Sequence, residues 1–409
     1  MGSSQSNRLD AGAEDRATGH AGAARRLRAD RAASANSLES SMNRRDLLTL
    51  GGAAAFLAAA VPRIIPAAAA FDDQPGSLRA RADRKGLLFG SAVNGRALGD
   101  PRLQKVLISD ANILVPENEL KWDAVMPAPD TYDFSRAEAI YAFAKANDMK
   151  MRGHTLTWYR SEPAWAADRI AGMSAAQTGD FLEDYVGHVV GHWKGRIAQW
   201  DVINEPTTAK GVLLEKLWSA KLGEQYMDIA LHATAQADPH ALRMMNQTLI
   251  AQEWWWEDKQ RDETLRIVEG LLKRGAPLQG FGYEAHLRTS YAFSEGKWAR
   301  FLEELKQMGL KFMITELDVD DSGTIGDVDA RDRASAALVK SLLDVSLSFD
   351  HCLGVLTWAA ADRYSWLMQD KDRKRSDGMA LRPTPRDADF QKKPVWNAIA
   401  QALDAAPAR

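Results

Sequence analysis

The stretch WDVINEP, residues 200–206, joins the pattern of a buried strand to two carboxylic acids. Its apolar residues favour a strand, and Pro206 cannot continue one because proline lacks the amide hydrogen that a sheet ladder needs. Glu205 therefore stands at the carboxyl end of the strand, where a sheet or a barrel would half-bury its side chain. A salt bridge or a helix cap would account for an acid in this place, and so would a carboxylic acid held for chemistry.

The alternation of a short strand with a longer helical stretch recurs along the chain after Phe71. The expected strands, rich in apolar and β-branched residues, are residues 86–93, 111–117, 150–156, 197–205, 241–247, 278–287, 311–319 and 352–359. Eight strands that alternate with helices over roughly 320 residues predict a single (β/α)8 TIM barrel. A doubly wound open sheet is the alternative, but the glycines of GSAVNGRALG, residues 90–99, lack the spacing of a phosphate-binding loop.

Capping residues place several helix boundaries. Asp100 before Pro101 predicts a helix start, and Ser135 with Glu138 has the spacing of a capping box that would open a helix reaching about Asp148. Further helices are expected from Ser294 to Gly309, over residues 337–349 and over residues 393–405.

Polar or aromatic side chains end six of the predicted strands. They are Glu117, Asn118, His154, Asn204, Glu205, Glu284, His286, Glu316, Asp318 and Trp358. The carboxyl ends of the strands form one face of a TIM barrel, and active sites lie on that face. So many polar strand ends therefore indicate a functional site on this face of the predicted barrel.

Glu205 and Glu316 end the fourth and seventh strands, which face each other across the mouth of an eight-stranded barrel. Two carboxyl groups that flank a glycosidic bond are the machinery of glycoside hydrolysis. One must be protonated and the other ionised, and different surroundings can separate their pKa values. Asn204 could hydrogen-bond a sugar hydroxyl, while His286 and Asp318 could form a hydrogen-bonded string that holds Glu316 as an anion.

Three tryptophans, Trp158, Trp358 and Trp366, lie at or just after predicted strand ends. Any one of them could simply pack in the core. Because sugar rings have apolar faces that pack against indole rings, three tryptophans near one rim favour carbohydrate binding.

Taken in order, these motifs resemble those of glycoside hydrolase family 10, the endo-β-1,4-xylanases, over about residues 75–405. The matching motifs are VPENELKW at 115–122, RGHTLTW at 152–158, WDVINEP at 200–206, ITELD at 314–318, and Trp358 with DRYSW at 362–366. The resemblance implies that residues 71–409 are a glycoside hydrolase catalytic domain. Its substrate would be xylan or xylo-oligosaccharide, cut at internal β-1,4-xylosidic bonds with retention.

The resemblance also assigns roles to the polar strand ends. Glu205 maps onto the acid/base and Glu316 onto the nucleophile of a double displacement. The family's glycone-side contacts map onto Glu117, Asn118, Lys121, His154, Trp158 and Trp366. Asn204, His286 and Trp358 map onto the site of the sugar being cleaved, and Asp318 onto the partner of the strand-six histidine.

Three departures from the family pattern put subsite affinities in question. Glu284 stands where the family usually has glutamine, which adds a third acid near Glu316; either its field raises a pKa in the cluster or His286 is protonated to compensate. NQTL at 246–249 replaces NDYN and removes a leaving-side aromatic. Tyr159-Arg160-Ser161 replaces His-Ser-Gln and removes a glycone-side glutamine.

The N-terminal part of the chain is not expected to belong to the fold. Residues 1–41 are predicted to be a disordered or over-called extension, with the true start at residue 42. Residues 42–70 contain Arg44 and Arg45, a short apolar run and a small-residue cleavage site, and they resemble a twin-arginine signal peptide. Export to the periplasm or the medium is expected, without a stable membrane span after processing.

Charge and composition exclude several partners. Residues 1–70 hold 9 of the 52 basic and 6 of the 55 acidic residues, so the rest of the chain has a formal net charge of −6. This acidic body argues against a nucleic acid partner. Cys352 is the single cysteine, so no intramolecular disulfide can form. No metal or cofactor is expected, since His188 and His192 lack the acid of a zinc motif. We expect a monomer.

Two other functions stay open on the sequence alone. A sugar-binding or sensing barrel without turnover would account for Glu284 and the altered strand five. A barrel endo-glucanase would need room for the C6 hydroxymethyl of glucose near Trp358 and Trp366.

The run 254–256, WWW, could be a carbohydrate platform or a helix start. KDRKRSD, 371–377, is expected as a solvated loop, with contact to acidic side groups of xylan as the alternative.

Overall fold

The computed structural model describes residues 75–370 and 373–409. The expected extension at 1–41 and signal at 42–70 lie outside these residues. Among the helices that can be described, none is long and apolar enough to cross a membrane.

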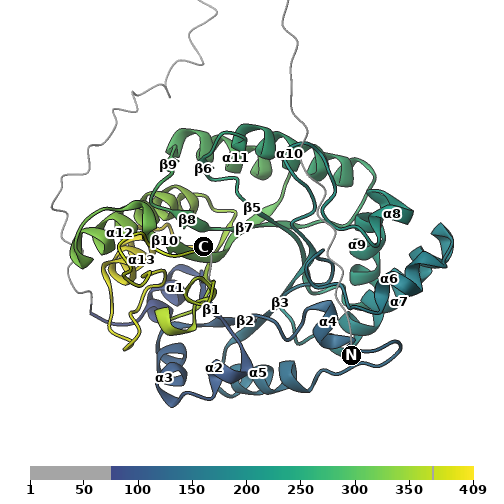
Figure 1. Ribbon diagram of the computed structural model, residues 1–409, viewed down its shortest axis with the longest axis horizontal. Coiled ribbons are helices and arrows are strands. Elements are labelled where there is room, and N and C mark those ends of the chain that lie inside the picture. The colour runs from purple at the N-terminus through teal and green to yellow at the C-terminus, as the bar shows by residue number, and fades with distance from the viewer. Residues whose placement is uncertain (1–74, 371–372) are drawn as a thin grey trace, which may run out of the picture. The chain divides into compact units, whose positions relative to one another are not determined.

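The eight expected strands close into a parallel barrel. They are β1 (Leu88–Val93), β2 (Ile113–Pro116), β3 (Lys150–Gly153), β4 (Gln199–Asn204), β5 (Leu242–Thr248), β7 (Gly280–Glu284), β10 (Lys311–Asp320) and β11 (Cys352–Thr357). Each pairs in parallel with the next, and β11 pairs with both β10 and β1. Figure 1 shows the strands surrounded by helices. The (β/α)8 prediction is confirmed, and an open sheet is excluded.

Helices follow the strands and cover the outside of the barrel. The longer ones are α1 (Leu78–Lys85), α3 (Pro101–Asp110), α5 (Ser135–Ala146), α7 (Ala175–His192), α9 (Gln225–Ala237), α10 (Glu257–Lys273), α11 (Glu295–Gln307), α12 (Val328–Ser348) and α13 (Pro394–Ala405). The short ones are α2 (Gly95–Leu98), α4 (Trp122–Val125), α6 (Ala166–Ala171) and α8 (Ser219–Leu222). Beyond the barrel ladder, β8 (His286–Arg288) runs beside β10, and β6 (Gln252–Glu253) pairs with β9 (Ala292–Phe293).

Two predicted helix caps are confirmed, and a third is wrong. Asp100 accepts a hydrogen bond from the backbone of Arg102 at the start of α3, and Ser294 caps α11. At α5 the capping box is absent, because Asp133 accepts from the Ser135 backbone N–H at 2.9 Å in place of a serine cap. Glu138, the expected partner in that box, instead accepts hydrogen bonds from Arg196 in the turn between α7 and β4.

Helix α12 also begins earlier than expected, at Val328 instead of residue 337, because Asp327 supplies its cap. The last helix, α13, covers the expected residues 393–405 almost completely.

A buried ion pair lies inside the barrel among apolar side chains. Arg152 on β3 and Asp201 on β4 are each 1% exposed, and the guanidinium holds both carboxylate oxygens. A lone buried charge would be strongly destabilising, so each of these side chains requires the other. The pair fixes β3 against β4 immediately below the strand ends.

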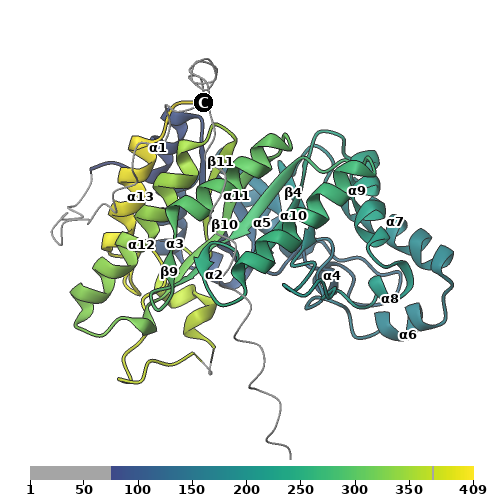
Figure 2. The ribbon, with the colours of Figure 1, turned by 90° about the horizontal axis from the view of Figure 1, so that it is seen from above.

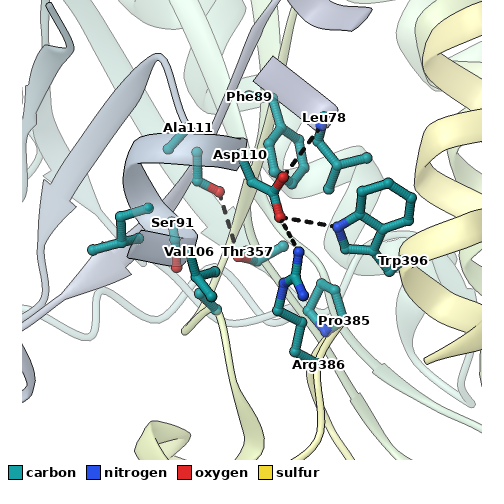
Figure 3. A pocket seen from close by; sticks show the side chains of 13 residues that line it. Leu78, Phe89, Ser91, Val106, Asp110, Ala111, Thr357, Pro385, Arg386 and Trp396 are labelled. Atoms are coloured by element: carbon teal, nitrogen blue, oxygen red, sulfur yellow. Dashed lines mark hydrogen bonds and ion pairs between the residues drawn. The ribbon is translucent and has the colours of Figure 1, made fainter. Parts of the chain in front are cut away.

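Asp110, at the end of α3, ties together segments from both ends of the described chain. Its carboxylate accepts hydrogen bonds from Arg386 at 2.7 Å, from the indole of Trp396 at 3.0 Å and from the Leu78 backbone at 3.4 Å (Figure 3). The cavity beside it is about 20 Å³, room for about one water. Asp110 thereby helps hold α1 and α13 side by side (Figures 1 and 2).

We predict that Asp110→Ala lowers the free energy of unfolding by about 3 kcal/mol, since it leaves a largely buried arginine and a buried indole N–H without their acceptor. Urea denaturation followed by circular dichroism measures the change. The matched control is Asp344→Ala, which removes an exposed pair with Lys340 on α12 and should cost about 0.5 kcal/mol. Equal losses in the two variants would contradict the structural role of Asp110.

Candidate active site

A cavity of about 420 Å³ lies at the carboxyl ends of the strands. Among the residues that line it are Glu117, Asn118, Lys121, His154, Trp158, Asn204, Glu205, Glu284, His286, Glu316, Trp358 and Trp366. These are all the site residues expected from the sequence except Asp318, which lies behind His286. The barrel thus brings together side chains from six strand ends and the loops after them.

Glu205 follows β4 and has a backbone φ of +45°, a region that glutamate rarely occupies. Its N–H donates to the carbonyl of Asn246 at 2.9 Å, so the strained residue is held against β5. Burial, and then the negative charge of Glu316, raise the pKa of Glu205. A raised pKa keeps a proton on this carboxyl group, which a general acid requires.

Glu316 lies on β10 and is 5% exposed. It accepts hydrogen bonds from Asn246 Nδ2 at 2.9 Å and from His286 Nε2 at 3.2 Å. Burial alone would raise its pKa, but the hydrogen bond from His286 and the charges of His154, His286 and Lys121 hold the pKa below its usual value. The surroundings of Glu205 and Glu316 therefore move their pKa values in opposite directions.

His286 lies between two carboxylates. Its Nδ1 is 2.9 Å from Asp318, and Asp318 also accepts from the indole of Trp366 at 2.8 Å. Burial works against the charged ring, but the charge and hydrogen bond of Asp318, together with Glu316, raise the pKa of His286 to about 10. The ring is then protonated at neutral pH and donates from both nitrogens, as the expected string from Asp318 to Glu316 requires.

Asn246, at the end of β5, is the main residue of the site that the sequence reasoning undervalued. Its Nδ2 is 2.9 Å from an oxygen of each of three side chains, Asn204, Glu284 and Glu316. Its Oδ1 accepts from Thr315 Oγ1 at 2.7 Å, and the carboxyl groups on the other side favour this orientation of the amide. The signal was present, since Asn246 is a polar end of a predicted strand like the residues that were singled out.

The floor of the cavity rests on the ion pair inside the barrel. His154 Nδ1 is 3.0 Å from Asp201 and 4.0 Å from Glu316, and the peptide bond from His154 to Thr155 is cis. Asp201 therefore connects Arg152 below to the histidine that faces the cavity.

One wall of the cavity is built after β2 and β3. Lys121 donates to Asn118 at 2.9 Å and lies 4.7 Å from the ring of Trp158. Asn94 donates to Glu117 at 2.7 Å. These contacts hold an ammonium group, a carboxyl group and an indole along one side of the cavity, a combination suited to sugar hydroxyls and ring faces.

Three arginines that line the cavity were not among the expected site residues: Arg160, Arg288 and Arg373. Arg160 and Arg288 each donate to a tyrosine hydroxyl. The solvated-loop prediction for 371–377 is wrong at Arg375, which is 7% exposed and donates to the backbone of Asp321. Charge alternation made this segment look exposed, whereas Asp321 and Asp377 neutralise the buried guanidinium.

The tryptophan run 254–256 does not line the cavity. Trp254 packs on Tyr291 at 4.2 Å, and Trp255 is 78% exposed. The helix after it, α10, begins only at Glu257.

Glu284, His286 and Glu316 come close enough to one another, within 4.8 Å, to surround a small cation. Both ring nitrogens of His286 are engaged with carboxylates. A protonated imidazole has no lone pair to offer a metal. The hydrogen bonding of this group therefore fits a proton better than a metal ion.

The fold and the site define a class of protein. A parallel barrel whose mouth holds one carboxyl group favouring its proton and one favouring ionisation has the architecture of a glycoside hydrolase. The family model of glycosyl hydrolase family 10 matches residues 77–402, and the chain belongs to this family. The resemblance seen in the sequence motifs is confirmed.

Known relatives cover most of the chain. Endo-1,4-beta-xylanase C from Phanerodontia chrysosporium is 30% identical over 321 residues, which cover 78% of this chain and 77% of that protein. Native xylanase 10B from Thermotoga maritima has a TM-score of 0.73 at 28% identity and covers 80% of this chain and 98% of its own. Xylanase 10B from Thermotoga petrophila, solved with xylobiose, has a TM-score of 0.73 at 29% identity, covering 81% and 98%.

The site predicts that His286 stays protonated above neutral pH. Its pKa is raised from 6.5 to about 10, so the stabilisation it provides is complete below about pH 6.5 and is lost as the pH rises through about 10. Nitrogen NMR of labelled histidine should find both ring nitrogens protonated at about pH 8. Asp318→Asn should lower the titration midpoint, while Asp389→Asn at an exposed site should not. A neutral ring at that pH in the unaltered protein would refute the assignment.

Proposed function

We propose that this protein hydrolyses internal β-1,4-xylosidic bonds of xylan and xylo-oligosaccharides by a retaining double displacement. One observation carries the proposal: Glu205 and Glu316 line the same cavity, and their surroundings move their pKa values in opposite directions. Membership of glycosyl hydrolase family 10 and the activities named for its relatives support the same function.

In the first step a carboxylate oxygen of Glu316 attacks the anomeric carbon and forms a glycosyl ester. The bond from that carbon to the leaving oxygen breaks, and the leaving oxygen takes the proton of Glu205. Because the hydrogen bonds from Asn246 and His286 hold Glu316 as an oriented anion, the nucleophile needs little reorganisation before attack.

In the second step water loses a proton to the Glu205 carboxylate, and its oxygen attacks the anomeric carbon. The ester bond to Glu316 breaks and both catalytic groups return to their starting states. Two inversions at one carbon give net retention, and Glu205 serves first as acid and then as base.

Aromatic and polar groups support binding of a sugar chain. The ring of Trp358 packs edge-on against those of His154 and His286, with ring centroids 5.2 and 6.4 Å away. Trp366 is fixed by its hydrogen bond to Asp318. A glucan substrate would need room for an additional hydroxymethyl group beside these two indoles, so comparing release of reducing ends from xylan and from cellulose separates the xylanase and endo-glucanase functions.

Glu205→Gln should reduce kcat on xylan by about 10²–10⁴-fold, because the acid/base proton is lost. Glu316→Gln should reduce it at least as far. On an aryl xylobioside whose leaving group needs no proton, Glu205→Gln should keep a fast first step while Glu316→Gln stays inactive. Glu304→Gln, on the exposed face of α11, is the matched control.

Proton NMR of the first-formed product should detect the β-anomer before mutarotation. An α-anomer as the first product, or near-normal turnover by Glu316→Gln, would overturn the double displacement. Xylan binding without any release of reducing ends would identify a binding or sensing barrel instead.

We also propose that residues 42–70 direct export through the twin-arginine pathway. Replacing Arg44 and Arg45 together by lysine should leave the protein in the cytoplasm of a bacterial host with that pathway. The control is the same exchange at Arg25 and Arg26, a second arginine pair within the predicted extension. Fractionation and immunoblotting measure the outcome, and export that depends on the second pair would place the signal elsewhere.

A further inference from the structure

Glu284 is a third carboxyl group beside the two proposed to react. It ends β7, is 2% exposed and lines the same cavity as Glu205 and Glu316. Its Oε1 accepts from Asn246 Nδ2 at 2.9 Å. Glu205 lines the same cavity, and two carboxyl groups can hydrogen-bond to each other only when one of them carries a proton.

The hydrogen-bond donors around this cluster are too few for three anions. Asn246 Nδ2 has two hydrogens but faces three oxygens, those of Asn204, Glu284 and Glu316. A flipped amide would turn its Oδ1 towards the carboxyl groups of Glu284 and Glu316 and would offer them no donor at all. The backbone of Gly282 also packs closely against this amide, because a Cβ atom at position 282 would lie only 2.2 Å from Asn246 Oδ1. A proton on Glu284 removes one carboxylate from the acceptors that compete for the two hydrogens of this amide.

We propose that Glu284 keeps its proton through the catalytic cycle and donates a hydrogen bond to the Glu205 carboxylate, acting as a positioning residue for the acid/base. This inference rests on the proposed function, because it assigns Glu205 that role. A carboxylic acid here provides a hydrogen-bond donor, as a glutamine amide would, but its donor hydrogen can be titrated.

The charges around Glu284 favour the neutral acid. The anions that face it are Glu316 from β10 and Glu205 and Asp201 from β4, and burial and then these charges raise its pKa well above the usual value. The cations within the cluster are committed elsewhere: Arg152 holds Asp201, and His286 holds Asp318 and Glu316. Arg160 is exposed and donates to Tyr159.

Glu284 neither gains nor loses a proton during the proposed reaction. Glu205 gives its own proton to the leaving oxygen and becomes a carboxylate. Glu284 then donates its O–H to that carboxylate, and such a hydrogen bond to an anion is shorter and stronger than one from an amide. When water returns a proton to Glu205 in the second step, Glu284 still holds its own.

Infrared difference spectroscopy tests the protonation state without turnover. At pH 7 the spectrum of Glu205→Gln minus that of Glu205→Gln/Glu284→Gln should contain the carbonyl band of one protonated carboxylic acid. Other buried acids, such as Glu215 with its pKa raised to about 8, cancel in the difference. Absence of the band would overturn the proposal, whatever the activity of Glu205 variants.

The pH dependence of kcat/KM tests the link to Glu205. When Glu205 loses its proton, the proton of Glu284 is shared between the two carboxyl groups and stabilises the anion. This sharing lowers the pKa of Glu205 relative to a site without it. Glu284→Gln cannot share a proton, so its alkaline limb should move to higher pH. Glu284→Leu, which has no donor, should lose about tenfold to hundredfold in kcat with little change in KM.

The sign of the shift is decisive. If Glu284 were ionised in the working enzyme, removal of its charge would lower the pKa of Glu205 and move the alkaline limb to lower pH. A limb that moves down or stays in place therefore overturns the proposal. If Glu205→Gln retains full turnover, the proposed function fails instead, and the infrared result still reports the state of Glu284.

Discussion

Carboxyl groups buried at the mouth of the barrel each need a compensating donor, and the site is arranged around that need. Asp201 is held by Arg152, Asp318 by His286 and Trp366, and Glu316 by His286 and Asn246. Where donors are insufficient, a carboxyl group keeps its proton. The distribution of donors therefore divides the acids into anions and neutral acids, and this division is the basis of the proposed chemistry.

Most of the fold could be predicted from the sequence because each strand is short, apolar and separated from the next by a helix. The barrel rule then placed the polar strand ends on one face, and the structure gathers those side chains around one cavity. Glu205 and Glu316 were identifiable because Glu205 directly follows β4 and Glu316 lies in the second half of β10, so both side chains reach the same end of the closed barrel. At these two positions the local sequence pattern and the barrel topology both place the side chain at the mouth of the barrel.

What the sequence could not supply were contacts between distant residues. Asn246 was treated as a departure from a motif, although its amide contacts three other strand ends. Arg375 looked solvated because its burial depends on Asp321, which lies 54 residues earlier. The capping box at Ser135 failed because Asp133 and Arg196 compete for the same groups. In each case a partner outside the local pattern decided the outcome.

The carboxylate of Asp110 has a consequence for biosynthesis. It joins α3 to the indole of Trp396, 286 residues further along the chain, and the barrel itself closes only when β11 pairs with β1. A nascent chain emerging from the ribosome cannot close the barrel until β11 has been translated, and it cannot complete the contact to Trp396 until α13 has been translated. Contacts of such sequence separation slow folding, so partly formed strands stay exposed in the meantime. Chaperone demand should consequently be greatest just before α13 emerges.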